Sequence, residues 1–176
     1  MEQLKNQPCP VCKKNTLTLS QEEKDIPHFG KTLIFSMGCS DCGYHKGDVE
    51  SVERKEPIKY TFTIEKEKDL KVHVIKSSEA TVKVPQLKME VTPGPASDGY
   101  YSTIEGVLDK FKKVIESERD STDDDDVKKH AKNLLKKLWN VSLGEMPLKI
   151  VIEDPSGNSA ILSDKAVVEK LKVKES

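Results

Sequence analysis

Apolar and polar residues alternate in several short segments near the middle of the chain, which is the pattern of a half-buried β-strand. The alternation recurs in four segments: Tyr60–Ile64, Leu70–Val74, Ala80–Val84 and Leu87–Val91. Because Pro85 interrupts the pattern, the last of these strands is expected after a bend or at a sheet edge. Residues 45–92 are therefore predicted to be mainly β, and residues 92–99, rich in proline and glycine, are predicted to form a loop.

Two later segments carry apolar residues every three or four positions, the spacing of an amphipathic helix. In the first segment these residues are Ile104, Val107, Leu108, Phe111, Val114 and Ile115. In the second they are Val127, Ala131, Leu134, Leu135 and Leu138. Ser102 and Glu105 form a capping box before the first helix, and Asp123–Asp126 suits the positive end of the second helix dipole. The connection at residues 117–122 is short, so an antiparallel hairpin is expected at about residues 102–140.

The β pattern returns after the predicted hairpin. Leu148–Ile152 is expected as a strand, residues 154–158 as a turn and Ser159–Leu162 as a second strand, with a short amphipathic helix around Val167, Val168 and Leu171. This order predicts an α+β chain that is mainly β, in which residues 48–176 form a β domain with the helical hairpin inserted.

The four cysteines of the chain form two C-x-x-C pairs: Cys9, Cys12, Cys39 and Cys42. Each C-x-x-C turn brings two thiolates to one metal ion, and two such turns complete a tetrahedral four-cysteine zinc site. The interval between the pairs holds two plausible strands, at residues 16–24 and 31–37, which is the layout of a zinc ribbon. Residues 1–47 are therefore predicted to be a zinc ribbon, with one structural Zn²⁺ because a closed shell leaves no position for water.

Four cysteines in two pairs can also serve other chemistry. Redox C-x-x-C pairs more often occur singly beside a βαβ unit, which this pattern lacks. Two disulfides are disfavoured in the cytoplasm, and an iron–sulfur cluster remains an alternative. His45 lies three residues after Cys42 and could compete as a ligand, although a surface histidine is the simpler interpretation. Gly43 follows the second pair, where the backbone often needs a positive φ, whereas Lys13 stands at the equivalent position of the first pair.

Composition and the lack of some motifs exclude several classes of function. The 176 residues carry a formal net charge of −1, and aromatic residues are few, so there is no electrostatic case for nucleic-acid binding. No apolar run is long enough to span a membrane and the N-terminus is not a signal peptide, so a cytoplasmic protein without membrane association is expected.

The sequence shows no catalytic motif. Phosphate-loop and dinucleotide fingerprints are lacking, and no catalytic triad is suggested. Residues 154–159 could bind a metal or activate a hydroxyl, but their composition also suits a hairpin turn. A non-enzymatic binding protein is predicted.

Several blocks resemble the ZPR-type zinc-finger proteins, in which a C-P-x-C knuckle precedes an I-P-x-F segment and a C-x-x-C-G-Y knuckle. The chain carries these motifs and further blocks in the same order: Ile26-Pro-His-Phe29, Cys39-Ser-Asp-Cys-Gly-Tyr44, Val84-Pro-Gln-Leu87, Thr103-Ile-Glu-Gly106 and Ile152-Glu-Asp-Pro-Ser-Gly-Asn-Ser159. The resemblance implies a zinc ribbon joined to a double-stranded β-helix or β-sandwich-like domain with an inserted helical hairpin. The chain departs from the family pattern at Lys13, where the family has glycine.

The resemblance also implies a partner, translation elongation factor 1-alpha, for which the family acts as a folding chaperone or assembly factor. This GTPase is expected to contact the helical hairpin and the ribbon tip, near His28, Phe29, Tyr44 and His45. Phe29 could anchor in a partner pocket or pack against the ribbon's own knuckles. The alternative function is a zinc-ribbon accessory protein of transcription or translation that binds nucleic acid.

Overall fold

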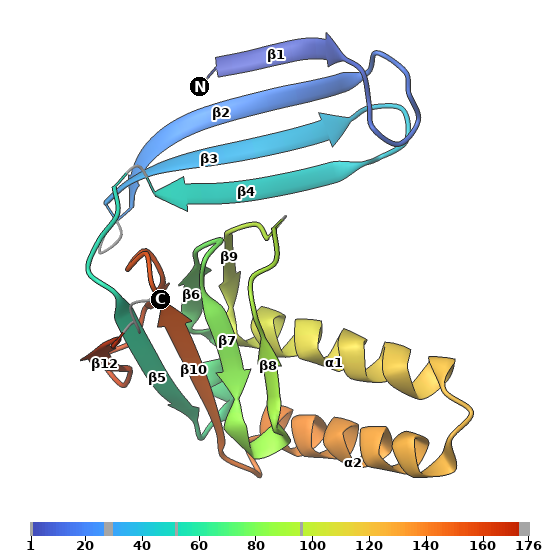
Figure 1. The fold of residues 1–176 in the computed structure, drawn as a ribbon, viewed down its shortest axis with the longest axis vertical. Coiled ribbons are helices and arrows are strands. Elements are labelled where there is room, and N and C mark those ends of the chain that lie inside the picture. The colour runs from blue at the N-terminus through green and yellow to red at the C-terminus, as the bar shows by residue number, and fades with distance from the viewer. Residues whose placement is uncertain (1, 27–29, 52, 96, 173–176) are drawn as a thin grey trace.

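Two β structures follow one another along the long axis of the molecule, and a pair of helices projects from one side of the second (Figure 1). The computed structural model describes residues 2–26, 30–51, 53–95 and 97–172. Strands dominate and the two helices are consecutive, which confirms the predicted α+β, mainly β, fold class.

The first structure is one antiparallel sheet with the strand order β1-β2-β3-β4. Its strands are β1 (Glu2–Gln7), β2 (Leu17–Ile26), β3 (Gly30–Cys39) and β4 (His45–Ser51). Strands β2 and β3 pair over their whole length, with Leu17 opposite Cys39. They extend the two strands predicted between the cysteine pairs. The pattern gave no sign of β1, because all but one of its residues are polar.

The second structure contains two further sheets. The five-stranded sheet has the order β12-β5-β10-β7-β8, and the three-stranded sheet has the order β11-β6-β9. The bounds are β5 (Ile58–Ile64), β6 (His73–Lys76), β7 (Thr81–Val84), β8 (Met89–Val91), β9 (Tyr100–Thr103), β10 (Leu148–Asp154), β11 (Ala160–Ile161) and β12 (Val167–Lys170). Two 3-10 helices, η1 (Glu67–Lys71) and η2 (Pro85–Leu87), lie between strands. One apolar core includes Phe62 and Ile150 from the larger sheet and Val74 and Ile161 from the smaller one, so the sheets form a β sandwich.

The helical hairpin consists of α1 (Ile104–Ser121) and α2 (Asp125–Ser142), which run antiparallel (Figure 1). The apolar stripe of α1 is buried in the sandwich core, with Val114 as the exception at 55% exposed. The cap of α1 is Thr103, whose hydroxyl accepts a hydrogen bond from the Gly106 N–H at 3.2 Å, so the prediction of Ser102 was wrong by one residue. Asp124 caps α2, as the acidic run suggested.

Three further sequence predictions were wrong. Residues 70–74 are not one strand, because η1 occupies the first part and β6 begins only at His73. Residues 167–170 form the edge strand β12 instead of a helix, paired with β5. The turn at residues 154–158 does not close a hairpin, since β10 pairs with β5 and β7 whereas β11 pairs with β6 in the other sheet.

Candidate metal centre

The two C-x-x-C turns lie at the same end of the first sheet, one between β1 and β2 and the other between β3 and β4 (Figure 1). They share one backbone geometry. The Lys13 N–H donates to the Cys9 carbonyl at 3.0 Å, and the Gly43 N–H donates to the Cys39 carbonyl at 3.2 Å. Both donors have positive φ, 63° for Lys13 and 72° for Gly43. The knuckle conformation is therefore kept at Lys13 although a lysine replaces the glycine that suits this region.

The four cysteine sulfurs form a compact cluster. All four lie within 4.8 Å of one another. The Sγ atoms of Cys9 and Cys42 are 3.7 Å apart, and those of Cys12 and Cys39 are also 3.7 Å apart. Zinc at about 2.3 Å from each sulfur of a regular tetrahedron requires sulfur–sulfur distances of about 3.8 Å. The cluster thus has the size and donor set of one four-cysteine zinc site, and a zinc ion held there has no open position.

The surroundings shift the pKa values of two of the thiols in opposite directions. The Thr16 hydroxyl lies 3.1 Å from Cys39 Sγ, and its hydrogen bond, aided by the Cys42 backbone N–H, lowers the pKa of the Cys39 thiol to about 6. The Tyr44 backbone N–H also lowers the pKa of Cys42, but burial and hydrogen bonds with the three other cysteines outweigh it and raise that pKa to about 12. Four sulfurs packed this closely repel one another as anions, and a divalent cation at the centre removes this cost.

The cluster is also the core of the first sheet. Cys9 and Cys39 are buried together with Leu17, and a few partly buried residues pack against them: Cys12, Leu19, Met37 and Tyr44. This core is small beside the one in the sandwich. Metal ligation therefore replaces hydrophobic burial as the main source of stability for this sheet.

The residues expected at the partner surface have different positions. Tyr44 is half-buried and packs against the cysteine cluster, whereas His45 is exposed at the start of β4. His28 and Phe29 lie outside the described residues.

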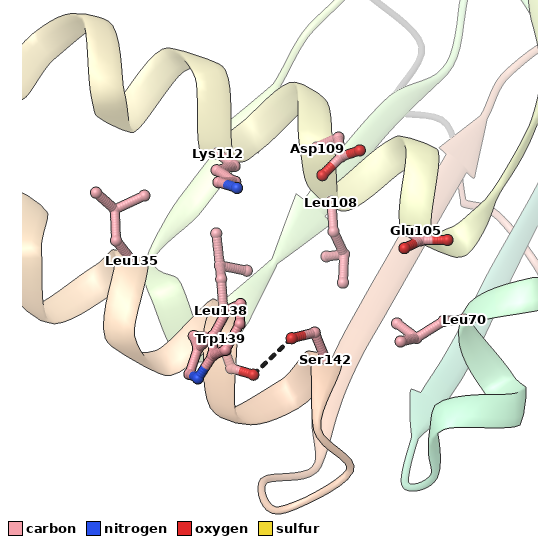
Figure 2. Close-up of a pocket in the computed structure, with 9 residues that line it drawn as sticks. All are labelled: Leu70, Glu105, Leu108, Asp109, Lys112, Leu135, Leu138, Trp139 and Ser142. Carbon is pink, nitrogen blue, oxygen red and sulfur yellow. Dashed lines mark hydrogen bonds between the residues drawn. The ribbon is translucent and has the colours of Figure 1, made fainter.

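Sequence patterns missed a second feature, a cleft of about 210 Å³ at the base of the helical hairpin (Figure 2). Leu108 of α1, Leu138 of α2 and Leu70 of η1 line it, and Figure 2 shows these side chains pointing into the space between the elements. Trp139 stands at its edge with 63% of its surface exposed. Glu105 and two neighbours on α1, Asp109 and Lys112, add polar groups. Trp139 is the single tryptophan of the chain. Its position outside the apolar stripe of α2 was the sequence signal that could have indicated this cleft.

Asp154, which the sequence placed in a turn, has no exposed surface. One carboxylate oxygen accepts hydrogen bonds from the backbone N–H and hydroxyl of Ser156, at 2.8 and 2.7 Å. The other accepts from the Asn158 N–H at 3.0 Å and from the Ser159 hydroxyl at 2.6 Å. Burial alone raises the pKa of Asp154, but the hydrogen bonds from Ser159 and Ser156 outweigh it and hold the pKa below its usual value. Asp154 thus stabilises the crossing between the two sheets, with its acceptor positions occupied.

The four-sulfur cage on a β-hairpin frame, followed by a β sandwich, defines the class: a zinc-ribbon protein with a second, larger β domain. Family profiles agree on both parts. The profile of the ZPR1 zinc-finger domain matches residues 1–57, and that of the ZPR1 jelly-roll domain matches residues 68–176. The chain belongs to the ZPR1 family.

Individual relatives support this assignment. A protein of Pyrococcus horikoshii described as an uncharacterized ZPR1-like protein is 37% identical over 171 residues, 95% of this chain and 77% of the relative. A ZPR1-like protein of Methanocaldococcus jannaschii is 34% identical over 165 residues, 93% of this chain and 83% of the relative. The zinc finger chaperone zpr1 of Schizosaccharomyces pombe is 31% identical over 159 residues, 87% of this chain but 33% of that longer relative.

Neither helix in the described ranges has the length and apolar composition that crossing a membrane demands.

Proposed function

We propose that this protein is a non-enzymatic binding protein whose partner is translation elongation factor 1-alpha, and that it assists the folding or assembly of this GTPase in the cytoplasm. The resemblance of its sequence blocks to ZPR-type proteins supports this partner. The description of the S. pombe relative as a zinc finger chaperone supports the chaperone role. The zinc in this proposal is structural, because four thiolates fill its coordination shell.

The observation that carries the binding role is Trp139. Trp139 is 63% exposed beside an apolar cleft, and tryptophan is among the residue types most enriched in binding hot spots. Beside it lies the cleft lined by Leu108 and Leu138, which can receive an apolar side chain. The acidic Glu105 and Asp109 at its edge favour a partner segment that combines apolar and basic residues.

The ribbon supplies a second contact surface in this proposal. His45 is exposed next to the cage, and the half-buried Tyr44 fixes the local surface by packing on the cysteines. His28 and Phe29, which lie outside the described residues, are also proposed to contribute to partner binding. A partner that contacts both the ribbon and the helical hairpin would bind at two well-separated points of the molecule (Figure 1).

Size-exclusion chromatography of the zinc-loaded protein with its cognate elongation factor 1-alpha tests the proposal. The mixture is run with GDP, with a GTP analogue and without nucleotide, and a co-eluting complex is expected in at least one state. Trp139→Ala is expected to weaken the complex by about 2 kcal/mol, roughly 30-fold in Kd, because it removes a central aromatic anchor.

Val168→Ala is the matched control. Val168 is 53% exposed on β12, far from the hairpin, so its truncation should leave the affinity unchanged. Absence of a complex with folded and unfolded elongation factor in every nucleotide state would contradict the proposed partner. Equal loss with both variants would contradict the role of the hairpin cleft.

A further inference from the structure

A second cavity lies where the first sheet meets the β sandwich. It has a volume of about 320 Å³ and is bounded by Gly47 of β4, residues 97–100 and one face of α1. Its wall is mainly apolar, from Val82, Val91, Val107 and Phe111. Two lysines, Lys76 and Lys110, also line it. An apolar cavity with a few converging polar groups is the usual form of a small-ligand site.

Lys76 is an unusual component of this wall because only 4% of its surface is exposed. Its ammonium group donates one hydrogen bond, to the Ser77 carbonyl at 2.9 Å. Within the described part of the chain, no carboxylate lies within ion-pair distance of it. An ammonium has three donors, and a buried charge without a counter-ion is costly. Burial accordingly lowers the pKa of Lys76, and the nearby Lys110 lowers it further, against the opposing effect of Asp154 and other acids.

Lys110 brings a second positive charge to the same place. Its Nζ lies 3.9 Å from the centroid of the Tyr100 ring, and the Nζ of Lys76 lies 5.7 Å from the same centroid. No ion pair involves Lys110 among the residues that the structure describes. Burial raises the pKa of Tyr100 to about 12, so its hydroxyl is a neutral donor at physiological pH.

The acids nearest to the cavity are already engaged. Asp98 pairs with Lys46 at 3.0 Å. Asp48 accepts hydrogen bonds from the backbone N–H groups of Val49 and Gly99, both at 2.8 Å. The pair formed by Asp98 and Lys46 is neutral. The carboxylates of Asp48 and Asp154 raise the pKa of Lys76 from outside the lining, so Lys76 and Lys110 are the charged lining residues without an ion-pair partner among the described residues.

We propose that this cavity binds a small anion, with a phosphate or carboxylate group held between Lys76 and Lys110 and an apolar group against the valines and Phe111. An oxyanion accepts the unused donors of Lys76 and separates two cations that otherwise repel each other. Because Gly47 belongs to the first sheet and the two lysines to the sandwich domain, the ligand also links the two β structures. This site is independent of the proposed protein partner.

Titration of the ¹⁵N-labelled, zinc-loaded protein, followed by NMR and calorimetry at constant ionic strength, tests the proposal. Inorganic phosphate and acetate probe the head group, and phenyl phosphate and benzoate probe the apolar wall. Saturable binding is expected for at least one probe, with the amide shifts of Ser77, Gly99 and Tyr100 changing first. The aromatic probe should bind more tightly than its small counterpart, and the comparison of phosphate with carboxylate identifies the preferred head group.

Lys110→Met is the main variant, because Lys110 is an exposed residue of α1 and its loss should not affect folding. It is expected to weaken binding at least about tenfold, the effect of losing one charge-assisted hydrogen bond. Lys113→Met, on the same helix but away from the cavity, should bind as the wild type does. Lys76→Met should abolish binding if it folds. Absence of saturable binding by all four probes, or equal weakening in Lys110→Met and Lys113→Met, would overturn the proposal.

Discussion

Among single residues, Asp154 shows how the protein keeps a charge inside its core. The four hydrogen bonds that it accepts replace the water lost on burial, and two of them come from hydroxyl groups of the same short segment. Gly157 completes this segment with a φ of 71°, and a Cβ atom there would overlap the backbone oxygen of Glu56. A side chain at position 157 is therefore excluded both by conformation and by space.

We predict that Asp154→Asn lowers the free energy of unfolding by about 3 kcal/mol, because an amide nitrogen would face groups that are themselves donors. Urea denaturation measures this change. Asp164→Asn is the matched control, since Asp164 is exposed and its charge should contribute little. A loss for Asp154→Asn no larger than that for Asp164→Asn would contradict the structural role.

The same carboxylate predicts a pH dependence. Its folded-state pKa lies below the unfolded value of about 3.9, so the folded state binds fewer protons in this range. The stability that Asp154 contributes is complete above the unfolded pKa and is lost as the pH falls through the folded pKa. Asp154→Asn should remove this part of the acid dependence, which denaturation curves at several pH values below about 5 can detect.

At the scale of elements, capping determines where the hairpin helices begin. Asp124 accepts hydrogen bonds from the N–H groups of Asp126 and Val127, at 2.8 and 3.3 Å, while Asp123 has no such role. Asp124→Ala should therefore destabilise the protein by about 1 kcal/mol, and Asp123→Ala by less. Thermal unfolding compares the two variants. Equal effects would mean that the charge of the acidic run, and not the cap, stabilises α2.

Periodicity predicted the elements in which the buried face matches the spacing of apolar residues in the sequence. Strand β5 alternates because one face is in the core, and α1 shows its stripe because the sandwich covers one side. Periodicity failed at β12, because the spacing of Val167, Val168 and Leu171 suits a helix, whereas both valines are exposed and pairing with β5 decides the structure. It failed at residue 70 because the buried Asp69 side chain accepts hydrogen bonds from the N–H groups of Glu65 and Lys66 and holds the chain in η1.

The candidate sites also differ in how far the sequence predicts them. The metal site could be predicted because the spacing of the cysteines indicates it. The two cavities could not be predicted, because they depend on how distant segments pack. Trp139 lies outside the apolar stripe of α2, but the sequence could not show that a cleft opens beside it. The alternating pattern does not predict a charged residue at the buried position that Lys76 occupies in β6. The burial of Lys76 depends on Tyr100 and α1, which come later in the chain.

The whole molecule consists of two β structures with separate cores. The first sheet depends on the cysteine cluster, whereas the sandwich has an extensive apolar core of its own. The contacts that join them include the hydrogen bond from the Gly99 N–H to Asp48 and the ion pair of Lys46 with Asp98. These contacts are few and polar, so the two structures should differ in their dependence on zinc.

We predict that chelation of zinc opens the first sheet and leaves the sandwich folded. Zinc binding supplies on the order of 10 kcal/mol to a small zinc-stapled structure, more than its few buried residues can replace. Hydrogen exchange measured by mass spectrometry should show loss of protection in β2 and β3 and unchanged protection in α1 and β10. Unfolding of both parts together, or retained protection in β2 and β3, would contradict the separate roles of the two cores.

Four cysteines hold one zinc ion, and native mass spectrometry of the purified chain measures this directly. We expect one zinc per chain in the wild type, and loss of most bound zinc in Cys39→Ser, because a closed site needs all four thiolates. Ser40→Ala, one residue away, should keep its zinc. A chain that carries iron, that carries no metal and has two disulfides, or that keeps its zinc without Cys39 would contradict the claim.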